Sequence, residues 1–171
     1  MPKARLILDE LKACGVEYVT WLPDSESRHL FDEMLREPEL KVVEVCRENE
    51  AIAVACGLYF GGRVPVAMIQ NTGSLNAGDA LRGQAKDMHL PLLILIGYRS
   101  YEQMQQIRRG EPSGGGRIDS IAPLTEPYLT AMGIPHYLLQ SDADASLVRK
   151  AFQQAQDEQR PVAVLITREW E

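Results

Sequence analysis

The run from Leu90 to Ile96 is apolar at every position, and it constrains the fold more than any other feature of the sequence. A strand that is apolar on both faces belongs in the middle of a parallel sheet that helices cover on both sides. Further strands are expected at 16–22, 41–45, 64–69, 136–139 and 162–166. The sequence therefore predicts a sheet with several parallel strands and a buried centre.

Segments of helical character separate these strands. Apolar residues from Leu6 to Cys14 recur at helical spacing, and Gly15 follows where glycine often ends a helix. The segment from Glu48 to about Gly61 predicts a helix of small residues that is buried on most sides. Strands that alternate with helices indicate an α/β fold, an open parallel sheet with helices on both faces. We expect residues 1–171 to form a single domain. Further helices are expected at 25–36, 125–132 and 143–156, and a polar turn at 70–76 leads into another that ends near residue 86.

Composition excludes several classes of partner. The 171 residues carry 18 Lys and Arg against 24 Asp and Glu, a net charge of −6, which is the wrong sign for nucleic acid or an anionic membrane surface. No apolar stretch is long enough to span a bilayer. Cys14, Cys46 and Cys56 lie in apolar or helical stretches without a CxxC pattern or Cys/His cluster. This pattern predicts reduced, buried thiols in a cytoplasmic protein and no structural zinc or other metal site within the chain.

Candidate chemistry lies where strands end. In open parallel sheets, ligands bind at the carboxyl ends of the strands, where loops lead into helices. Three such loops carry polar residues: Pro23-Asp24-Ser25, Arg47-Glu48-Asn49-Glu50 and the segment from Gln70 to Asn76. A longer polar segment, 97–118, holds Arg99, Arg108, Arg109 and Arg117 and is expected to form a lid or an interface loop.

The residues in these loops resemble a known family. Glu48-Asn49-Glu50-Ala51-Ile52-Ala53-Val54-Ala55-Cys56-Gly57-Leu58-Tyr59 is similar to a run in the pyrimidine-binding (PYR) domain of thiamine diphosphate enzymes. The preceding Leu-Pro-Asp-Ser and the following Met-Gln-Asn-Thr-Gly-Ser-Leu-Asn resemble, in order and spacing, the α subunits of sulfopyruvate decarboxylases and the matching domain of phosphonopyruvate decarboxylases. The resemblance covers essentially the whole chain. It implies a PYR-type fold and the decarboxylation of a 2-oxo acid with thiamine diphosphate as cofactor.

The resemblance assigns the central catalytic role to Glu48. Thiamine catalysis requires a proton on ring nitrogen N1′ of the aminopyrimidine, and a carboxyl group can deliver it. Small apolar neighbours such as Ala51, Ile52 and Ala55 are expected to keep that carboxyl protonated by raising its pKa. The alternative is a first-turn acid that the helix macrodipole favours. Glu50 faces elsewhere on the helix and is expected to be structural.

The same resemblance suggests ligand contacts in the other loops, each with a structural alternative. Ser25 stands where related decarboxylases place a residue that touches the substrate carboxylate, but it could also cap a helix. Thr72 could contact the cofactor or serve the turn. The arginines of the 97–118 segment could be solvated, or their guanidinium groups could donate paired hydrogen bonds to a sulfonate or phosphonate. The predicted substrate-binding residues are Asp24, Ser25, Gln70, Asn71 and Arg99, and the predicted cofactor-binding residues are Glu48, Gln70, Asn71 and Thr72.

One motif of the family is missing. Thiamine diphosphate enzymes hold the diphosphate and Mg²⁺ with a Gly-Asp-Gly motif and a later Asn, whereas this chain has only Gly78-Asp79-Ala80. The resemblance therefore implies a separate β subunit that carries the diphosphate-binding domain and holds most of the Mg²⁺ contacts. We expect an isolated chain to associate with itself through the surface that the partner would cover.

The substrate implied by the resemblance is a small anionic 2-oxo acid. The closest family match predicts an α subunit that converts 3-sulfopyruvate to sulfoacetaldehyde and CO₂. A phosphonopyruvate decarboxylase subunit is the alternative within enzymes, because sulfonate and phosphonate differ mainly in charge. A noncatalytic α/β binding module is the alternative from another class, since fold alone does not establish function.

Overall fold

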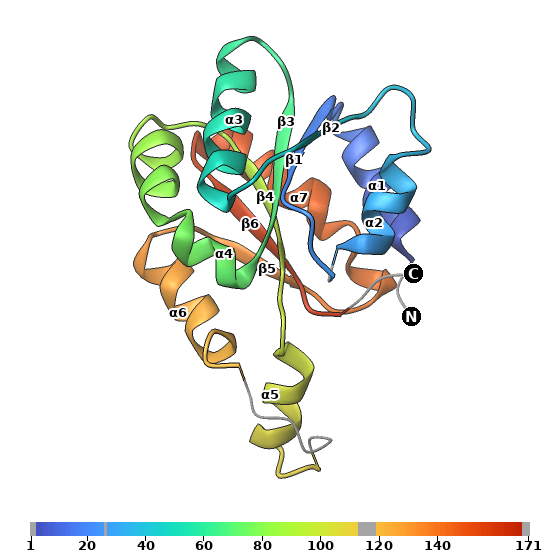
Figure 1. The fold of residues 1–171 in the computed structure, drawn as a ribbon, viewed down its shortest axis with the longest axis vertical. Coiled ribbons are helices and arrows are strands. Elements are labelled where there is room, and N and C mark those ends of the chain that lie inside the picture. Colours follow the sequence, from blue (N-terminus) through green and yellow to red (C-terminus); the bar gives the residue numbers. More distant parts are fainter. Residues whose placement is uncertain (1–2, 26, 113–118, 169–171) are drawn as a thin grey trace.

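The computed structural model describes residues 3–25, 27–112 and 119–168 and has a single sheet of six parallel strands (Figure 1). The strand order is β2-β1-β3-β4-β6-β5. The predicted open parallel α/β sheet is therefore confirmed. The strands are β1 (Tyr18–Trp21), β2 (Lys41–Glu44), β3 (Pro65–Gln70), β4 (Leu93–Gly97), β5 (His136–Leu139) and β6 (Val162–Ile166).

The central strands are the most apolar ones, as the sequence predicts. Every residue of β4 and β6 is buried, whereas the edge strand β2 has no buried residue. The strand β4 begins three residues later than the apolar run does. Pro91 has no N–H to donate to a ladder, so the residues from Leu90 to Leu92 enter the core as an irregular segment.

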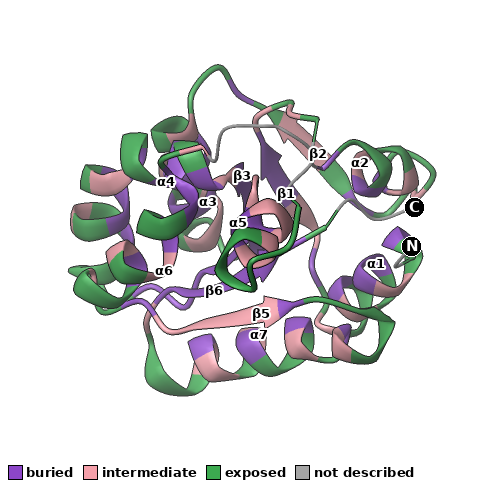
Figure 2. Ribbon diagram, turned by 90° about the horizontal axis from the view of Figure 1, so that it is seen from below, coloured by how far each residue is buried: buried purple, intermediate pink, exposed green. Residues whose placement is uncertain are grey.

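Helices cover both faces of the sheet (Figure 1). One face is packed by α1, α2 and α7, and the other by α3, η1 and α6, while α4 and α5 lie at the carboxyl ends of the strands. Figure 2 shows the resulting pattern, with exposed outer surfaces on helices whose inner surfaces are buried. The helices are α1 (Ala4–Ala13), α2 (Arg28–Met34), α3 (Glu48–Phe60), α4 (Asn71–Asn76), α5 (Tyr101–Arg108), α6 (Ala122–Ala131) and α7 (Leu147–Glu158), with a π-helical segment η1 (Ala80–Lys86) and a 3₁₀ turn η2 (Asp142–Asp144).

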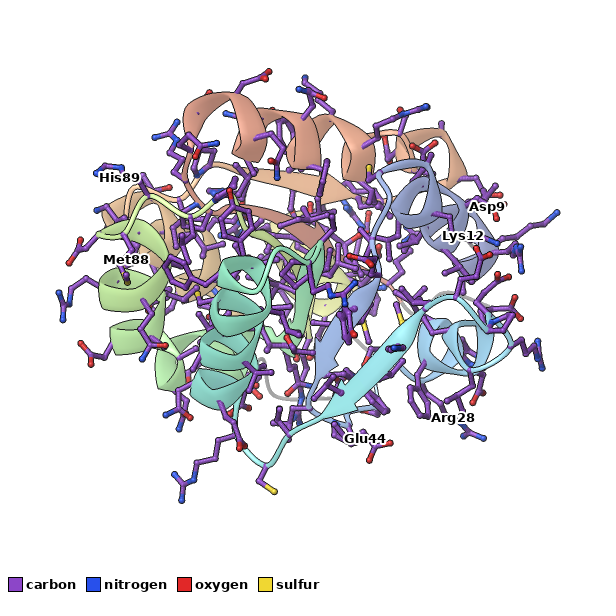
Figure 3. The ribbon with its side chains drawn as sticks, turned by 90° about the horizontal axis from the view of Figure 1, so that it is seen from above. Asp9, Lys12, Arg28, Glu44, Met88 and His89 are labelled. Carbon is purple, nitrogen blue, oxygen red and sulfur yellow. The ribbon has the colours of Figure 1, made fainter. Side chains whose placement is uncertain are left out.

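The helices α1 and α3 bury different kinds of surface. In α1, one stripe that includes Ile7, Leu8 and Leu11 is buried, and charged residues such as Asp9 and Lys12 project from the molecule (Figure 3). In α3 the buried residues are mostly small, so the helix packs closely on the sheet. The Thr20 hydroxyl in β1 donates a hydrogen bond of 2.8 Å to the carbonyl of Ala51, which fixes the first turn of α3 over β1.

Three local predictions were wrong. The second helix begins at Arg28 with Ser27 as its N-cap, not at Ser25, because the Asp24 carboxylate accepts hydrogen bonds from Ser27 and holds the chain in a turn before the helix. No polar turn separates β3 from the next helix, since α4 follows β3 directly. Of the three cysteines expected to be buried, only Cys56 is: Cys46 is exposed in the short turn between β2 and α3, and Cys14 is half-buried at the end of α1.

The long segment after β4 is partly helical. The helix α5 projects beyond the carboxyl ends of the strands, at the bottom of Figure 1, where a lid or interface would be expected. Arg117, one of the arginines singled out in this segment, lies outside the described residues. None of the helices in the described ranges is both long enough and apolar enough to cross a membrane.

Candidate active site

The carboxyl ends of β1, β2 and β3 lie side by side at one edge of the sheet. The strand register aligns Trp21 at the end of β1 with Glu44 of β2 and with Met68 of β3. From β1 the chain proceeds to β2 on one side, and from β3 it proceeds to β4 on the other side. Open α/β sheets usually bind ligands where the direction of the connections reverses in this way. The three polar loops singled out from the sequence converge on this edge.

Glu48 is the first residue of α3, and its half-buried side chain lies against the first turn of α4. The contact is with Gly73. A Cβ atom added to Gly73 would lie 2.1 Å from Cγ of Glu48 and 2.4 Å from both Cδ and Oε1. In the part of the chain that the structure describes, the Glu48 carboxylate has no hydrogen-bond or ion-pair partner. A half-buried acid in this state is available to a group from outside the chain.

Glu50 is placed differently from Glu48. Its Oε2 atom accepts a hydrogen bond of 2.9 Å from the backbone N–H of Cys46. The two carboxylates are two residues apart and therefore leave α3 in different directions. Glu50 stabilises the turn before the helix, in keeping with the structural role expected for it.

Asn71 joins three elements. It is fully buried at the start of α4, and its Nδ2 atom donates to Thr125 Oγ1 at 3.1 Å and to the carbonyl of Arg99 at 3.3 Å. Its Oδ1 atom accepts a hydrogen bond from the backbone N–H of Thr72. These contacts tie α4 to α6 and to the segment after β4. A direct contact of Asn71 with a ligand stays a prediction.

Gln70 and Thr72 lie on the more accessible side of the same turn. Gln70 is half-buried and Thr72 is exposed, and the Thr72 hydroxyl donates a hydrogen bond of 2.7 Å to Oε1 of Gln70. The same Gln70 side chain also carries an amide nitrogen, which can donate a hydrogen bond. Both side chains thus lie close to Gly73, which Thr72 directly precedes, at the edge where Glu48 lies.

Two residues of α6 hold α4 in place, and neither is among the site residues expected from the sequence. The Thr125 hydroxyl accepts a hydrogen bond from the Asn71 side-chain amide, and the Tyr128 hydroxyl donates one of 3.1 Å to the carbonyl of Ser74. Burial raises the pKa of the Tyr128 hydroxyl, so it stays protonated as a donor. Each bond joins residues that are 54 positions apart, a separation that no local pattern reveals. The one available signal was a threonine at a buried position of a helix.

The remaining predicted residues lie at the carboxyl ends of two other strands, β1 and β4. Asp24 and Ser25 follow β1; Asp24 accepts from the backbone N–H of Ser27 at 3.0 Å and from its hydroxyl at 2.7 Å, while Ser25 is exposed. Arg99 follows β4, and its backbone meets Asn71. The exposed guanidinium of Arg99 lies 3.6 Å from Asp119, which leaves most of its donors toward solvent.

Residues 1–160 match the sequence model of the family described as "Thiamine pyrophosphate enzyme, N-terminal TPP binding domain". The chain belongs to this family. The match spans all three loops at the carboxyl edge, so the thiamine diphosphate resemblance inferred from their motifs is confirmed.

Several relatives of this domain carry the expected names. "Sulfopyruvate decarboxylase subunit alpha" of Methanococcus maripaludis is 27% identical over 153 residues, which cover 89% of this chain and 86% of that protein. "Sulfopyruvate decarboxylase" of Methanosarcina acetivorans is 24% identical over 167 residues, 96% of this chain but 40% of that protein. "Phosphonopyruvate decarboxylase" of Streptomyces viridochromogenes is 29% identical over 89 residues, 52% of this chain and 22% of that protein.

The residues at the carboxyl edge of this thiamine pyrophosphate domain suit one end of the cofactor. An aminopyrimidine ring pairs with a carboxylate and with hydrogen-bonding neighbours, and Glu48, which has no partner among the described residues, together with Gln70 and Thr72 would suit such a set. The diphosphate end finds no such set at Gly78-Asp79-Ala80. Asp79 lies on the surface between α4 and η1, with its side chain 91% exposed and paired with Arg82.

Proposed function

We propose that this chain is the α subunit of a thiamine-diphosphate-dependent decarboxylase that converts 3-sulfopyruvate to sulfoacetaldehyde and CO₂. The observation that carries the proposal is the Glu48 carboxylate, which lies without a partner in the described part of the chain at the ligand-binding edge of a thiamine pyrophosphate domain. The substrate is proposed from the names of two relatives, most of whose length is matched by this chain.

When bound, thiamine diphosphate supplies the nucleophilic carbon that adds to a 2-oxo acid and accepts the electrons left behind by CO₂. Glu48 is proposed to hold a proton at its carboxyl group and to share it with ring nitrogen N1′. Gln70 and Thr72 are proposed to orient the ring from the neighbouring turn. Asn71 is proposed to act with them, chiefly by holding the first turn of α4 at a fixed distance from α3.

The substrate is proposed to lie between the ends of β1 and β4. Ser25 offers an exposed hydroxyl and Arg99 an exposed guanidinium, and both suit an anionic 2-oxo acid. Asp24 is proposed to contribute by setting the turn that presents Ser25. Phosphonopyruvate is the second candidate substrate, because two relatives carry the name phosphonopyruvate decarboxylase.

A separate β subunit is proposed to hold the diphosphate and the Mg²⁺ ion. Two observations support this division. The surface position of Asp79 does not suit a diphosphate site, and the Methanosarcina relative has more than half of its length outside the region that this chain matches. The β subunit is proposed to cover the carboxyl edge, because Glu48 is only half-buried there and Thr72 beside Gly73 is exposed.

Calorimetry on the isolated chain tests the division of the cofactor site. With Mg²⁺ present, the chain alone should bind thiamine diphosphate more weakly than the micromolar range, because diphosphate and metal contacts supply most of the affinity. Tight binding by the chain alone would contradict a site shared between subunits. Sedimentation should show self-association of the isolated chain, and a strict monomer would contradict that expectation.

A decarboxylation assay tests the activity itself. A second subunit that copurifies with this chain from its source should restore turnover when thiamine diphosphate and Mg²⁺ are added. Release of CO₂ from sulfopyruvate in preference to phosphonopyruvate supports the first substrate, and the reverse preference supports the second. An assembled pair that turns over neither acid would favour a noncatalytic binding module.

A further inference from the structure

Gly73 occupies a position where glycine has no conformational advantage. Four glycines of the described chain adopt positive φ, and Gly73 is not among them. It lies inside the first turn of α4, where glycine is less favourable to a helix than alanine. The reason for a glycine here must therefore be the space that a side chain would fill.

That space contains the side chain of Glu48. The three atoms nearest to a Cβ on Gly73 all belong to Glu48: Cγ at 2.1 Å, and Cδ and Oε1 at 2.4 Å. These distances are far shorter than any carbon–carbon or carbon–oxygen contact permits. A methyl group at position 73 would overlap the Glu48 carboxyl group in its present position, so the two cannot be there together.

The helix α4 is the part of this contact that cannot easily yield. Its first residue, Asn71, is fully buried and bonded to Thr125, and the carbonyl of Ser74 accepts a hydrogen bond from Tyr128. Glu48, in contrast, is the flexible partner, since its carboxylate has no hydrogen-bond or ion-pair partner in the described chain. An added methyl group at position 73 would therefore displace the Glu48 side chain and leave α4 where it is.

We infer that Gly73 is a positioning residue, whose missing side chain admits the Glu48 carboxyl group to the place from which it serves the cofactor. This inference rests on the proposed function, because it concerns the acid that the proposal makes catalytic. It adds that the size of residue 73, 25 positions away in the sequence, decides where that acid points. The close contact between α3 and α4 thus determines the direction in which the Glu48 carboxyl group points.

The test is Gly73→Ala in the full chain, with Gly57→Ala as the matched control. Gly57 is an exposed glycine inside α3, and a Cβ there would meet nothing within 4 Å. Both variants should fold, and their Tm should stay level or rise by roughly 2 to 4 °C, because alanine favours a helix. Only Gly73→Ala should move the Glu48 carboxyl group.

The position of the carboxyl group can be measured without any activity. In the chain labelled with ¹³C at glutamate carboxyl carbons, Glu48→Gln identifies the Glu48 signal by its loss. The chemical shift of that signal should change in Gly73→Ala and remain as in the wild type in Gly57→Ala. A crystal structure of Gly73→Ala should show the Glu48 side chain turned away from α4. An unmoved carboxyl group would overturn the inference whether or not the chain proves to be a decarboxylase subunit.

Activity of the assembled enzyme supplies the second measurement. Gly73→Ala should lower kcat on the order of 10²-fold, as a misplaced catalytic group does, with little change in the KM for the 2-oxo acid. In the Glu48→Gln background the same substitution should lower kcat no further. Wild-type turnover with a displaced carboxyl group would overturn the inference. If the wild-type assembly itself is inactive, the proposed function fails and the NMR measurement still decides the role of Gly73.

Discussion

The turns that follow β1 and β2 each bring a carboxylate to the same edge of the sheet, but the two carboxylates differ in their hydrogen bonding. Asp24, after β1, accepts two hydrogen bonds from Ser27, whose hydroxyl also accepts one from the indole N–H of Trp21 at 2.8 Å. Glu48, after β2, rests against Gly73 without a hydrogen-bond or ion-pair partner in the described chain. The first acid stabilises its own loop, and the second is free of such bonds within the described chain.

This difference explains why position at the edge is a poor guide to function by itself. Both acids follow parallel strands, and both precede helices. The sequence resemblance predicts a place in the site for both, yet only the contacts separate an acid that is bonded within its own turn from an acid that has no such partner in the described chain. Substitution of each acid tests the distinction directly, and labelling of a nearby thiol tests whether a partner covers the edge that holds Glu48.

The largest effect is expected from Glu48→Gln in the assembled enzyme. The amide keeps the shape of the side chain but cannot deliver a proton to N1′, so turnover should fall on the order of 10² to 10⁴-fold while the subunits still associate. Glu50→Gln is the control, because within the described residues Glu50 bonds the turn at Cys46 and does not face α4. Steady-state decarboxylation and exchange of the thiazolium C2 proton measure the loss. Equal activity of the two variants, or a larger loss at Glu50, would remove the catalytic role from Glu48.

A smaller effect is expected from Asp24→Ala, and it should appear mainly in the free energy of unfolding and much less in turnover. The substitution leaves the hydroxyl of the buried Ser27 without its acceptor, so the free energy of unfolding should fall by about 1 to 3 kcal/mol. Urea unfolding of the isolated chain measures it. The kcat of the assembled enzyme should fall much less than in Glu48→Gln, and the predicted contact with substrate should appear as a higher KM. A kcat loss as large as that of Glu48→Gln would break the comparison between the two acids.

The smallest effect is expected in the rate at which Cys46 is alkylated. Cys46 is exposed in the turn that leads to Glu48, so a partner that covers this edge should slow its alkylation several-fold. Cys56 serves as the internal reference, because burial raises its pKa to about 11 and keeps it largely protonated at pH 8. Mass spectrometry after iodoacetamide treatment reads both thiols. Equal labelling of Cys46 with and without the second subunit would place the interface elsewhere.

The parts of the fold that depend on local pattern could be predicted from the sequence. The strands at 136–139 and 162–166 and the start of α3 at Glu48 have the expected bounds, because apolar runs and turn residues mark them directly. The order of the strands in the sheet has no local signature. The cap of α2 was misplaced from Ser27 to Ser25, because both serines suit an N-cap and only the bond to Asp24 selects one.

The candidate site was predictable to the same degree. The motifs predict that Glu48 and the residues from Gln70 to Thr72 act together, but they do not reveal that Gly73 faces Glu48 or that Thr125 anchors Asn71. Those contacts depend on how α3, α4 and α6 pack together. Such packing follows from the tertiary fold and not from any window of the sequence.

The two edge strands of the sheet also limit how copies of this chain can accumulate. Both β2 and β5 are only four residues long, and the exposed Lys41 and Glu44 stand at the two ends of β2. Short edges that carry charge are poor templates for further strands, so the sheet resists growth into fibrils. Association of copies of this chain should therefore stop at a finite size, built from helical surfaces, even at concentrations where an open sheet edge would precipitate.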